Sequence, residues 1–273
     1  MPTQRLTELP DTVLRLIEKA SGPVIDTGTV SAGLNSAIAA RIQTADRTLF
    51  VKGLPLNHPR VWTQQSEAHL SPHLKGIAPA LHWHIEEDGW SLLGFEYIQG
   101  HHADVTPASP DLPAITATMT RLAALPSPPL ELKSMAHRLR TYVDNPADLA
   151  WFAGDSLLHT EWNPHNILIT PGGALLVDWG WASTGAPWID PTLWLLWLIA
   201  HGHTCHQAEA AAAAHPAWQH APARGLNVLA LTQHRLWTSI AAQSPDNWAD
   251  PMQHAATTWH QHRQQATGQQ APT

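Results

Sequence analysis

Cysteine is almost absent from this sequence. Cys205 is the single cysteine among 273 residues, which excludes an internal disulfide and a zinc site built from several cysteines. Long hydrophobic runs are also missing, because the longest, residues 193–200, is far shorter than the roughly 18 residues that cross a bilayer. The N-terminal segment lacks the hydrophobic stretch of a secretory signal. We therefore expect a cytoplasmic protein with no membrane partner.

Basic residues are scarce as well. Lysine and arginine total 15 against 22 acidic residues, which gives a formal net charge of -7. Because no basic stripe is available to neutralise phosphates, nucleic acid is not an expected partner. The length allows one large domain or two lobes with ample hydrophobic core.

Hydrophobic periodicity changes along the chain near Gln99-Gly100. Before this point, β-prone runs predominate, with helical spacing at 11–21 and after Pro59. After it, helical patterns predominate, and one β-hairpin interrupts them. The strands are expected at 24–25, 36–43, 48–52, 80–86 and 90–98, and the later helices at 112–124, 130–143, 146–153, 189–202, 204–218, 223–243 and 248–264. We predict an α+β fold with a β-rich lobe at 1–99, which contains one inserted helix, and a mostly helical lobe at 100–273.

The interrupting hairpin lies in the stretch HTEWNPHNILITPGGALLVDWG, residues 159–180. Its turn is Pro171-Gly172-Gly173, between two short β-prone runs. Asn166 and Asp178 each lie six residues from Gly172, so folding at the turn would bring them opposite each other. An amide oxygen and a carboxylate suit magnesium. The alternative is structural, since Asn and Asp often flank turns.

Lys52 ends the apolar run 48–51 of a predicted strand. A lysine with apolar neighbours needs an anion nearby, unless it lies at a sheet edge and points to water. Glu67, on the helix after Pro59, is a candidate partner, although glutamates on helices are commonly solvated. The small-residue loop 28–36 contains Gly33, where the backbone can approach phosphates.

The order of these features resembles the aminoglycoside phosphotransferase and choline kinase family, whose fold is protein-kinase-like and bilobal. His159-x-Glu161-x4-Asn166 resembles the catalytic loop H-x-D-x4-N of that family. Residues 177–180, VDWG, resemble its metal-binding motif, and residues 188–191, WIDP, resemble the segment whose Asp braces the catalytic loop.

The resemblance implies a phosphotransferase that uses ATP or GTP with Mg²⁺ and transfers the γ-phosphate to a hydroxyl of a small molecule. Relatives act on aminoglycosides, choline, homoserine and other hydroxylated metabolites. The sequence leaves open the acceptor, the choice between ATP and GTP, and the oligomeric state. The implied residue roles are Glu161 at the acceptor hydroxyl, Asn166 and Asp178 as catalytic metal ligands, Lys52 on the α- and β-phosphates with Glu67 orienting it, Gly33 and Ser36 in the phosphate loop, Glu96 and Ile98 in the nucleotide-binding hinge, and His159 and Asp190 as structural support.

Glu161 departs from the family pattern, which has Asp at this position. The extra methylene displaces the carboxylate by roughly 1 Å, and a misplacement of that size can cost about a hundredfold in rate. Two interpretations follow. Either the acceptor pocket suits the longer side chain, which we favour because the other motif residues are present, or the protein is a pseudokinase-type nucleotide-binding or scaffold protein.

Two further clusters carry weaker signals. The segment 201–206, HGHTCH, contains metal-ligand residue types, but Gly202 and Thr204 indicate a helix break that would separate them. We do not predict a metal there. Trp179, Trp181 and Trp188 flank the motifs, and packing is a simpler explanation for them than an aromatic acceptor site.

Overall fold

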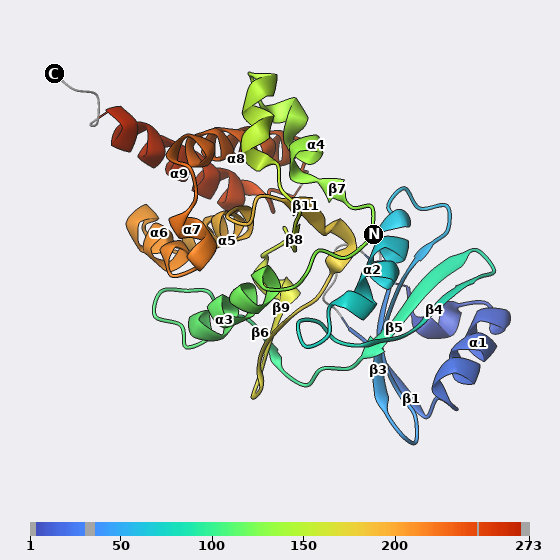
Figure 1. The fold of residues 1–273 in the computed structure, drawn as a ribbon. Coiled ribbons are helices and arrows are strands. Elements are labelled where there is room, and N and C mark those ends of the chain that lie inside the picture. Colours follow the sequence, from blue (N-terminus) through green and yellow to red (C-terminus); the bar gives the residue numbers. More distant parts are fainter. Residues whose placement is uncertain (1–3, 31–35, 245, 269–273) are drawn as a thin grey trace. The chain divides into compact units, whose positions relative to one another are not determined.

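The computed structural model describes residues 4–30, 36–244 and 246–268 and divides into two compact units (Figure 1). Unit 1 comprises Met1–His101 together with Thr170–Trp181, and unit 2 comprises His102–Ile169 and Ala182–Thr273. The segment Thr170–Trp181, expected from the sequence in the helical lobe, thus belongs to unit 1.

Unit 1 is built on a five-stranded antiparallel sheet with the strand order β1-β2-β3-β5-β4. The strands are β1 (Asp26–Thr29), β2 (Ile38–Gln43), β3 (Thr48–Pro55), β4 (Leu81–Glu87) and β5 (Trp90–Glu96). In β4, burial alternates as predicted, with Leu81, Trp83 and Ile85 partly buried and the residues between them exposed. The other elements of unit 1 are η1 (Leu6–Glu8), α1 (Asp11–Ser21), α2 (Trp62–Leu70), η2 (Ser71–His73), β10 (Gly173–Leu176) and η6 (Trp179–Trp181), where η denotes a 3-10 helix.

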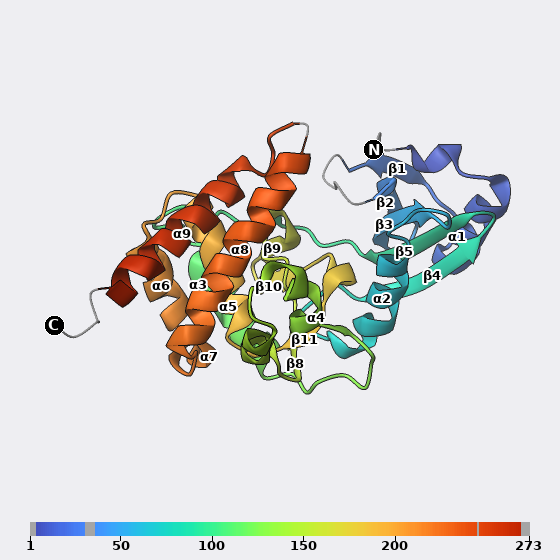
Figure 2. The ribbon, with the colours of Figure 1, turned by 90° about the horizontal axis from the view of Figure 1, so that it is seen from above.

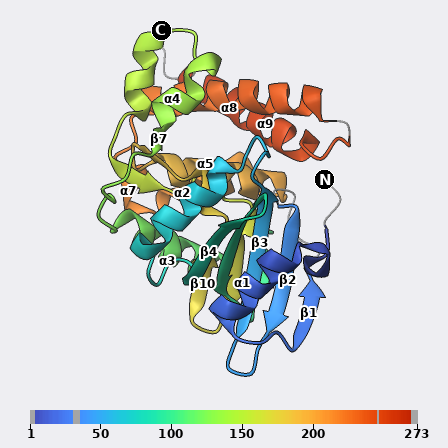
Figure 3. The same cartoon turned by 90° about the vertical axis from the view of Figure 1, so that its right-hand side faces the viewer.

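Helix α1 covers one face of this sheet (Figure 3). Its residues Val13 and Ile17 are fully buried in one hydrophobic cluster with Leu49 and Val51 of β3. Successive residues of a strand point to opposite faces, so Lys52 lies on the face of β3 away from this cluster. Lys52 is nevertheless only 7% exposed, and its ammonium group therefore needs partners within the protein.

Contacts of the segment 170–181 explain why it belongs to unit 1. The N–H of Leu176 donates to the carbonyl oxygen of Ile77 (2.8 Å). Next to it, η6 packs closely against α2, because a Cβ atom on Gly180 would lie 2.6 Å from the Cβ of Thr63. Only glycine allows this approach of the two backbones.

Unit 2 is mainly helical. Its helices are α3 (Leu112–Ala123), α4 (Met135–Leu139), η3 (Arg140–Tyr142), η4 (Pro146–Phe152), η5 (Pro164–Asn166), α5 (Ile189–Ala200), α6 (Cys205–Ala213), α7 (Pro216–Gln219), α8 (Ala223–Gln243) and α9 (Asp250–Gly268). Helices α8 and α9 lie side by side (Figure 2), and α5 is apolar and buried over most of its length. In the part of the chain that the structure describes, no helix combines the length and hydropathy needed to cross a bilayer.

Short strands also occur in unit 2. Strands β7 (Lys133–Ser134), β11 (Ser183–Gly185) and β8 (Ser156–Leu158) form a sheet in the order β7-β11-β8. The chain passes from one unit to the other within β6 (His101–His102) and within β9 (Ile167–Thr170), and the turn at Pro171-Gly172 connects β9 to β10.

Several predicted elements differ from those observed. The helix expected at 130–143 is β7 followed by α4 and η3, and the one expected at 146–153 is the 3-10 helix η4. The helix expected at 204–218 ends at Ala213, and α7 begins at Pro216, whose ring cannot continue a preceding helix. The prediction that one hairpin alone interrupts the helices was wrong, because strands of two or three residues are too short to show periodicity.

Candidate functional site

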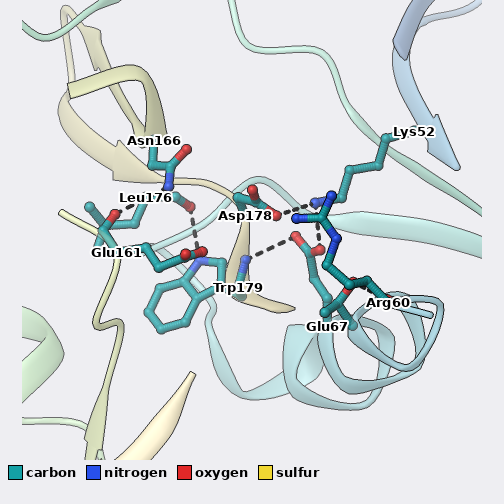
Figure 4. A network of polar contacts seen from close by, with 9 residues as sticks. Lys52, Arg60, Glu67, Glu161, Asn166, Leu176, Asp178 and Trp179 are labelled. Carbon is teal, nitrogen blue, oxygen red and sulfur yellow. Dashed lines mark hydrogen bonds and ion pairs between the residues drawn. The ribbon is translucent and has the colours of Figure 1, made fainter. Parts of the chain in front are cut away.

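Lys52 joins two carboxylates in unit 1 (Figure 4). Its Nζ lies 2.5 Å from Glu67 Oε2 and donates to Asp178 Oδ1 at 3.0 Å. The three residues come from β3, from α2 and from the segment after β10, so the fold brings together side chains that are far apart in sequence. Lys52 is thus a buried lysine with two acidic partners, not an edge lysine pointing to water.

The charge state of Lys52 follows from these contacts. Burial alone would lower the pKa of Lys52, but the carboxylates of Asp178 and Glu67 raise it above its ordinary value. Lys52 therefore remains a cation throughout the physiological pH range. Such a fixed positive charge next to a carboxylate suits the binding of a phosphate chain together with a divalent cation.

Backbone geometry fixes the direction of Asp178. Its φ is +65°, in the left-handed region, which Asp tolerates better than most residues. The next residue, Trp179, is 1% exposed and donates its backbone N–H to Glu67 Oε1 (3.3 Å) and its indole N–H to the Leu176 carbonyl (2.9 Å). Glu67 thus contacts both Lys52 and the residue after Asp178, so α2 orients both partners.

Removal of Lys52 is expected to destabilise the protein strongly. Lys52→Met should lower the free energy of unfolding by about 3–5 kcal/mol, because Glu67 would stay buried without its cation. The double variant Lys52→Met/Glu67→Leu should recover part of this loss, since apolar residues often replace a buried ion pair at little cost, although the N–H of Trp179 loses its acceptor. Urea denaturation followed by fluorescence measures both changes.

Lys19 supplies the matched control. It is exposed on α1, so Lys19→Met should change the free energy of unfolding by no more than about 0.5 kcal/mol. Equal losses for Lys52→Met and Lys19→Met would show that the Lys52 pair is not buried as described.

The loop that begins at His159 is held from within unit 2. Asp190, in the first turn of α5, accepts the backbone N–H groups of His159 at Oδ2 (2.9 Å) and of Thr160 at Oδ1 (3.0 Å). Burial raises the pKa of Asp190 to about 6, and these two hydrogen bonds act in the opposite direction. His159 is fully buried, and its Nδ1 accepts the N–H of Glu161 (3.3 Å). Both side chains therefore support the loop backbone.

Glu161 and Asn166 are connected within the same loop (Figure 4). The side-chain amide of Asn166 donates to the carbonyl oxygen of Glu161 at 3.2 Å. This contact uses the amide nitrogen and leaves the Asn166 oxygen as an acceptor. Asn163 caps the 3-10 helix η5, since its side chain accepts the N–H of His165 (3.0 Å). The oxygen of Asn166 is a hard ligand of the kind that Mg²⁺ takes.

A further polar residue next to this loop, Arg138, is marked by no sequence motif. Arg138 of α4 donates to the hydroxyl oxygens of Thr160 (2.7 Å) and Ser183 (2.9 Å). Burial lowers its pKa, and the charges of Glu161 and Asp190 oppose this effect. The sequence could not indicate this role, because the hydrogen-bond partners Thr160 and Ser183 lie 22 and 45 residues away along the chain.

The remaining candidates for nucleotide contacts lie in unit 1, except for Gly33, which falls outside the described residues. Ser36 is partly buried and precedes β2. Glu96 ends β5, and its N–H donates to the Ala80 carbonyl (2.8 Å). Ile98 follows two residues later, outside any regular element. Their roles stay predictions.

The histidine and tryptophan clusters have structural contacts. A ring nitrogen of His201 lies 2.8 Å from the Trp197 carbonyl, and one of His203 lies 2.9 Å from the Val105 carbonyl. Across residues 4–30, 36–244 and 246–268, no three His, Cys, Asp or Glu side chains are grouped so as to hold a metal ion. Trp179 and Trp188 are buried, and Trp181 packs edge to face against Trp62.

Solved structures with the same arrangement of elements include kinases of small molecules. A crystal structure of choline kinase LicA from Streptococcus pneumoniae matches with a TM-score of 0.62 and 15% identity, over 94% of this chain and 98% of that chain. A thermostable mutant of aminoglycoside phosphotransferase APH(4)-Ia matches with a TM-score of 0.61 and 15% identity, over 93% and 99%. The chain shares their fold.

A third structure agrees with these two. The aminoglycoside phosphotransferase from Alicyclobacillus acidocaldarius subsp. acidocaldarius DSM 446 matches with a TM-score of 0.60 and 12% identity, over 96% of this chain and 97% of that chain. The predicted fold class, an α+β protein-kinase-like fold, is therefore confirmed. No protein-family model matches the chain, and no curated protein matches its sequence. The likeness to these phosphotransferases thus lies in the fold.

Proposed function

We propose that this protein is an ATP- and Mg²⁺-dependent phosphotransferase, which transfers the γ-phosphate to a hydroxyl group of a small molecule. The observation that carries the proposal is the contact of buried Lys52 with both Glu67 and Asp178. A buried cation held between two acids adds little net stability compared with apolar side chains, which favours a role in binding a ligand.

Neighbouring structures support a nucleotide as that ligand. One structure of LicA is a complex with AMP, and one of APH(4)-Ia is a ternary complex with AMP-PNP and hygromycin B. We take ATP as the donor, with GTP as the other triphosphate to test. Unit 1, residues 1–101 with 170–181, would then mainly bind the nucleotide. Unit 2, the rest of the chain, would mainly bind the acceptor.

The residues of unit 1 would bind the nucleotide. Lys52 supplies positive charge to the α- and β-phosphates, and Glu67 keeps its ammonium group in place. Ser36, Glu96 and Ile98 contribute the phosphate loop and the hinge.

Asp178 and Asn166 offer a carboxylate and an amide oxygen, a hard-oxygen pair that fits Mg²⁺. Bound Mg²⁺ neutralises charge on the transferring phosphate.

The loop of unit 2 would meet the acceptor. Glu161 accepts a hydrogen bond from the acceptor hydroxyl and receives its proton as the phosphate is transferred. His159 and Asp190 hold the loop backbone, so the carboxylate of Glu161 starts from a fixed main chain. Phosphoryl transfer demands positioning and charge neutralisation above all, and these residues supply both.

The test is a transfer assay with an acceptor panel. Purified protein is incubated with γ-labelled ATP or GTP, Mg²⁺, and aminoglycosides, choline, homoserine and other hydroxylated metabolites. We expect label on at least one acceptor, and none when EDTA removes the metal. Nucleotide binding with no labelled acceptor in a broad panel would contradict the enzyme assignment.

The second candidate is a nucleotide-binding or scaffold protein without useful turnover. The observation that favours it is Glu161 itself, since its carboxylate extends one methylene beyond that of Asp. In that case, MgATP would bind as above, and Glu161→Gln would change no measurable transfer rate.

A further inference from the structure

Thr160, the residue before Glu161, has a backbone conformation that a β-branched residue rarely adopts. Its φ is +68°, in the left-handed region. Such conformations persist only where surrounding contacts hold them, and they concentrate at functional sites. The contacts that hold Thr160 therefore also determine where the backbone of Glu161 lies.

Two side chains from other elements hold Thr160. Asp190 of α5 accepts its backbone N–H at 3.0 Å. Arg138 of α4 donates through Nη1 to its hydroxyl oxygen at 2.7 Å, and the same nitrogen donates to the hydroxyl of Ser183 at 2.9 Å. The two contacts act on different parts of the residue, because Asp190 fixes the main chain of Thr160 and Arg138 fixes its side chain.

The small sheet β7-β11-β8 explains how these residues meet. Arg138 lies on α4, which directly follows β7, Ser183 begins β11, and Thr160 lies two residues after the end of β8. In the register, Ser183 pairs with Leu158 on β8 and with Lys133 on β7. Strands of two or three residues thus position the guanidinium group of Arg138 against the loop.

Arg138 also lies among acids. The negative charges of Glu161 and Asp190 act on its partly buried guanidinium group, which keeps its proton as arginines in proteins do. The side chain of Glu161 has three rotatable bonds and loses freedom when its carboxylate is fixed. Because Arg138 is hydrogen-bonded to Thr160, its positive charge lies close to the residue that carries this carboxylate.

We propose that Arg138 is a positioning residue for Glu161. It holds Thr160 in the left-handed conformation and draws the Glu161 carboxylate to one place, which compensates for the length of the glutamate side chain. Only the catalytic role of Glu161 rests on the proposed function. The placement of Glu161 by Arg138 is a structural claim that stands without an acceptor.

Crystal structures of the wild type and of two variants test the structural claim. Thr160→Val removes the acceptor of the Arg138 hydrogen bond and keeps the β-branched shape, whereas Ser183→Ala removes the other acceptor of the same nitrogen. We expect the Glu161 carboxylate to move by about 1 Å or more, or to take several conformers, in Thr160→Val. It should stay in place in Ser183→Ala. An unmoved carboxylate in Thr160→Val would overturn the proposal, whether or not the protein transfers phosphate.

Kinetics test the consequence once the wild type shows transfer. Thr160→Val and Arg138→Met should lower kcat by roughly 10–100-fold and leave KM for ATP within about twofold. Arg138→Lys should restore part of kcat, because an ammonium keeps the charge and one donor. Equal kcat in the wild type and Thr160→Val, with both folded by circular dichroism, would overturn the proposal. A wild type that binds no nucleotide would instead contradict the proposed function. The crystal structures would then decide alone whether Arg138 positions Glu161.

Discussion

Asp178→Asn is expected to abolish Mg²⁺-dependent nucleotide binding and to lower kcat by at least about 10³-fold. The substitution removes the negative charge that would hold the metal ion and keeps the size of the side chain. Asn also tolerates the left-handed region in which Asp178 lies, so the turn should keep its conformation. Calorimetric titration with ATP, with and without Mg²⁺, and initial rates of transfer measure the two effects.

Asp88 provides a control of the same kind. It lies in the turn between β4 and β5 with φ +47°, and its carboxylate accepts the hydroxyl of Thr12 (2.6 Å). Asp88→Asn makes the same chemical change at an exposed left-handed position, and both binding and kcat should remain within about twofold of wild type. Unchanged Mg²⁺-dependent affinity in Asp178→Asn would remove Asp178 from the metal site.

Glu161→Gln is expected to lower kcat by about 10²–10⁴-fold, the usual contribution of a general base. The amide keeps the length of the side chain and cannot accept the acceptor's proton. Affinity for MgATP should stay within about twofold, because the role of Glu161 is at the acceptor. Glu131→Gln, at an exposed loop position, makes the same change away from the site and should leave kcat unaltered.

Glu161→Asp distinguishes the two interpretations of this position. If the site is built around the longer side chain, the shorter acid should lose about a hundredfold in kcat, because its carboxylate is withdrawn by roughly 1 Å. The same initial-rate assay measures it. A rise in kcat would show that Glu161 is a misplaced base and would favour the binding-protein alternative.

Some parts of the fold could be predicted because their sequence patterns are long. Helix α8 occupies residues 223–243 as predicted, since its apolar residues recur with helical spacing over 21 residues. The β4–β5 hairpin could be predicted from alternation on both sides of Asp88-Gly89. An anionic partner of Lys52 could be predicted because apolar strand residues precede it, and the structure places it against Glu67 and Asp178.

Other parts left no local pattern. Strands β7, β8 and β11 contain two or three residues each, too few for alternation to show. Arg138 acts through residues 22 and 45 positions away, and a sequence without its fold gives no reason to connect them. The conformation of Thr160 was equally hidden, because β-branched residues seldom have a positive φ. Tertiary contacts decided all three features.

The most direct test of the central claim is a crystal structure with a non-hydrolysable ATP analogue and Mg²⁺. The account predicts a metal ion about 2.0–2.1 Å from oxygens of Asn166 and Asp178, with Lys52 in contact with the phosphates. Nucleotide bound elsewhere, or a metal ion coordinated by neither residue, would contradict it.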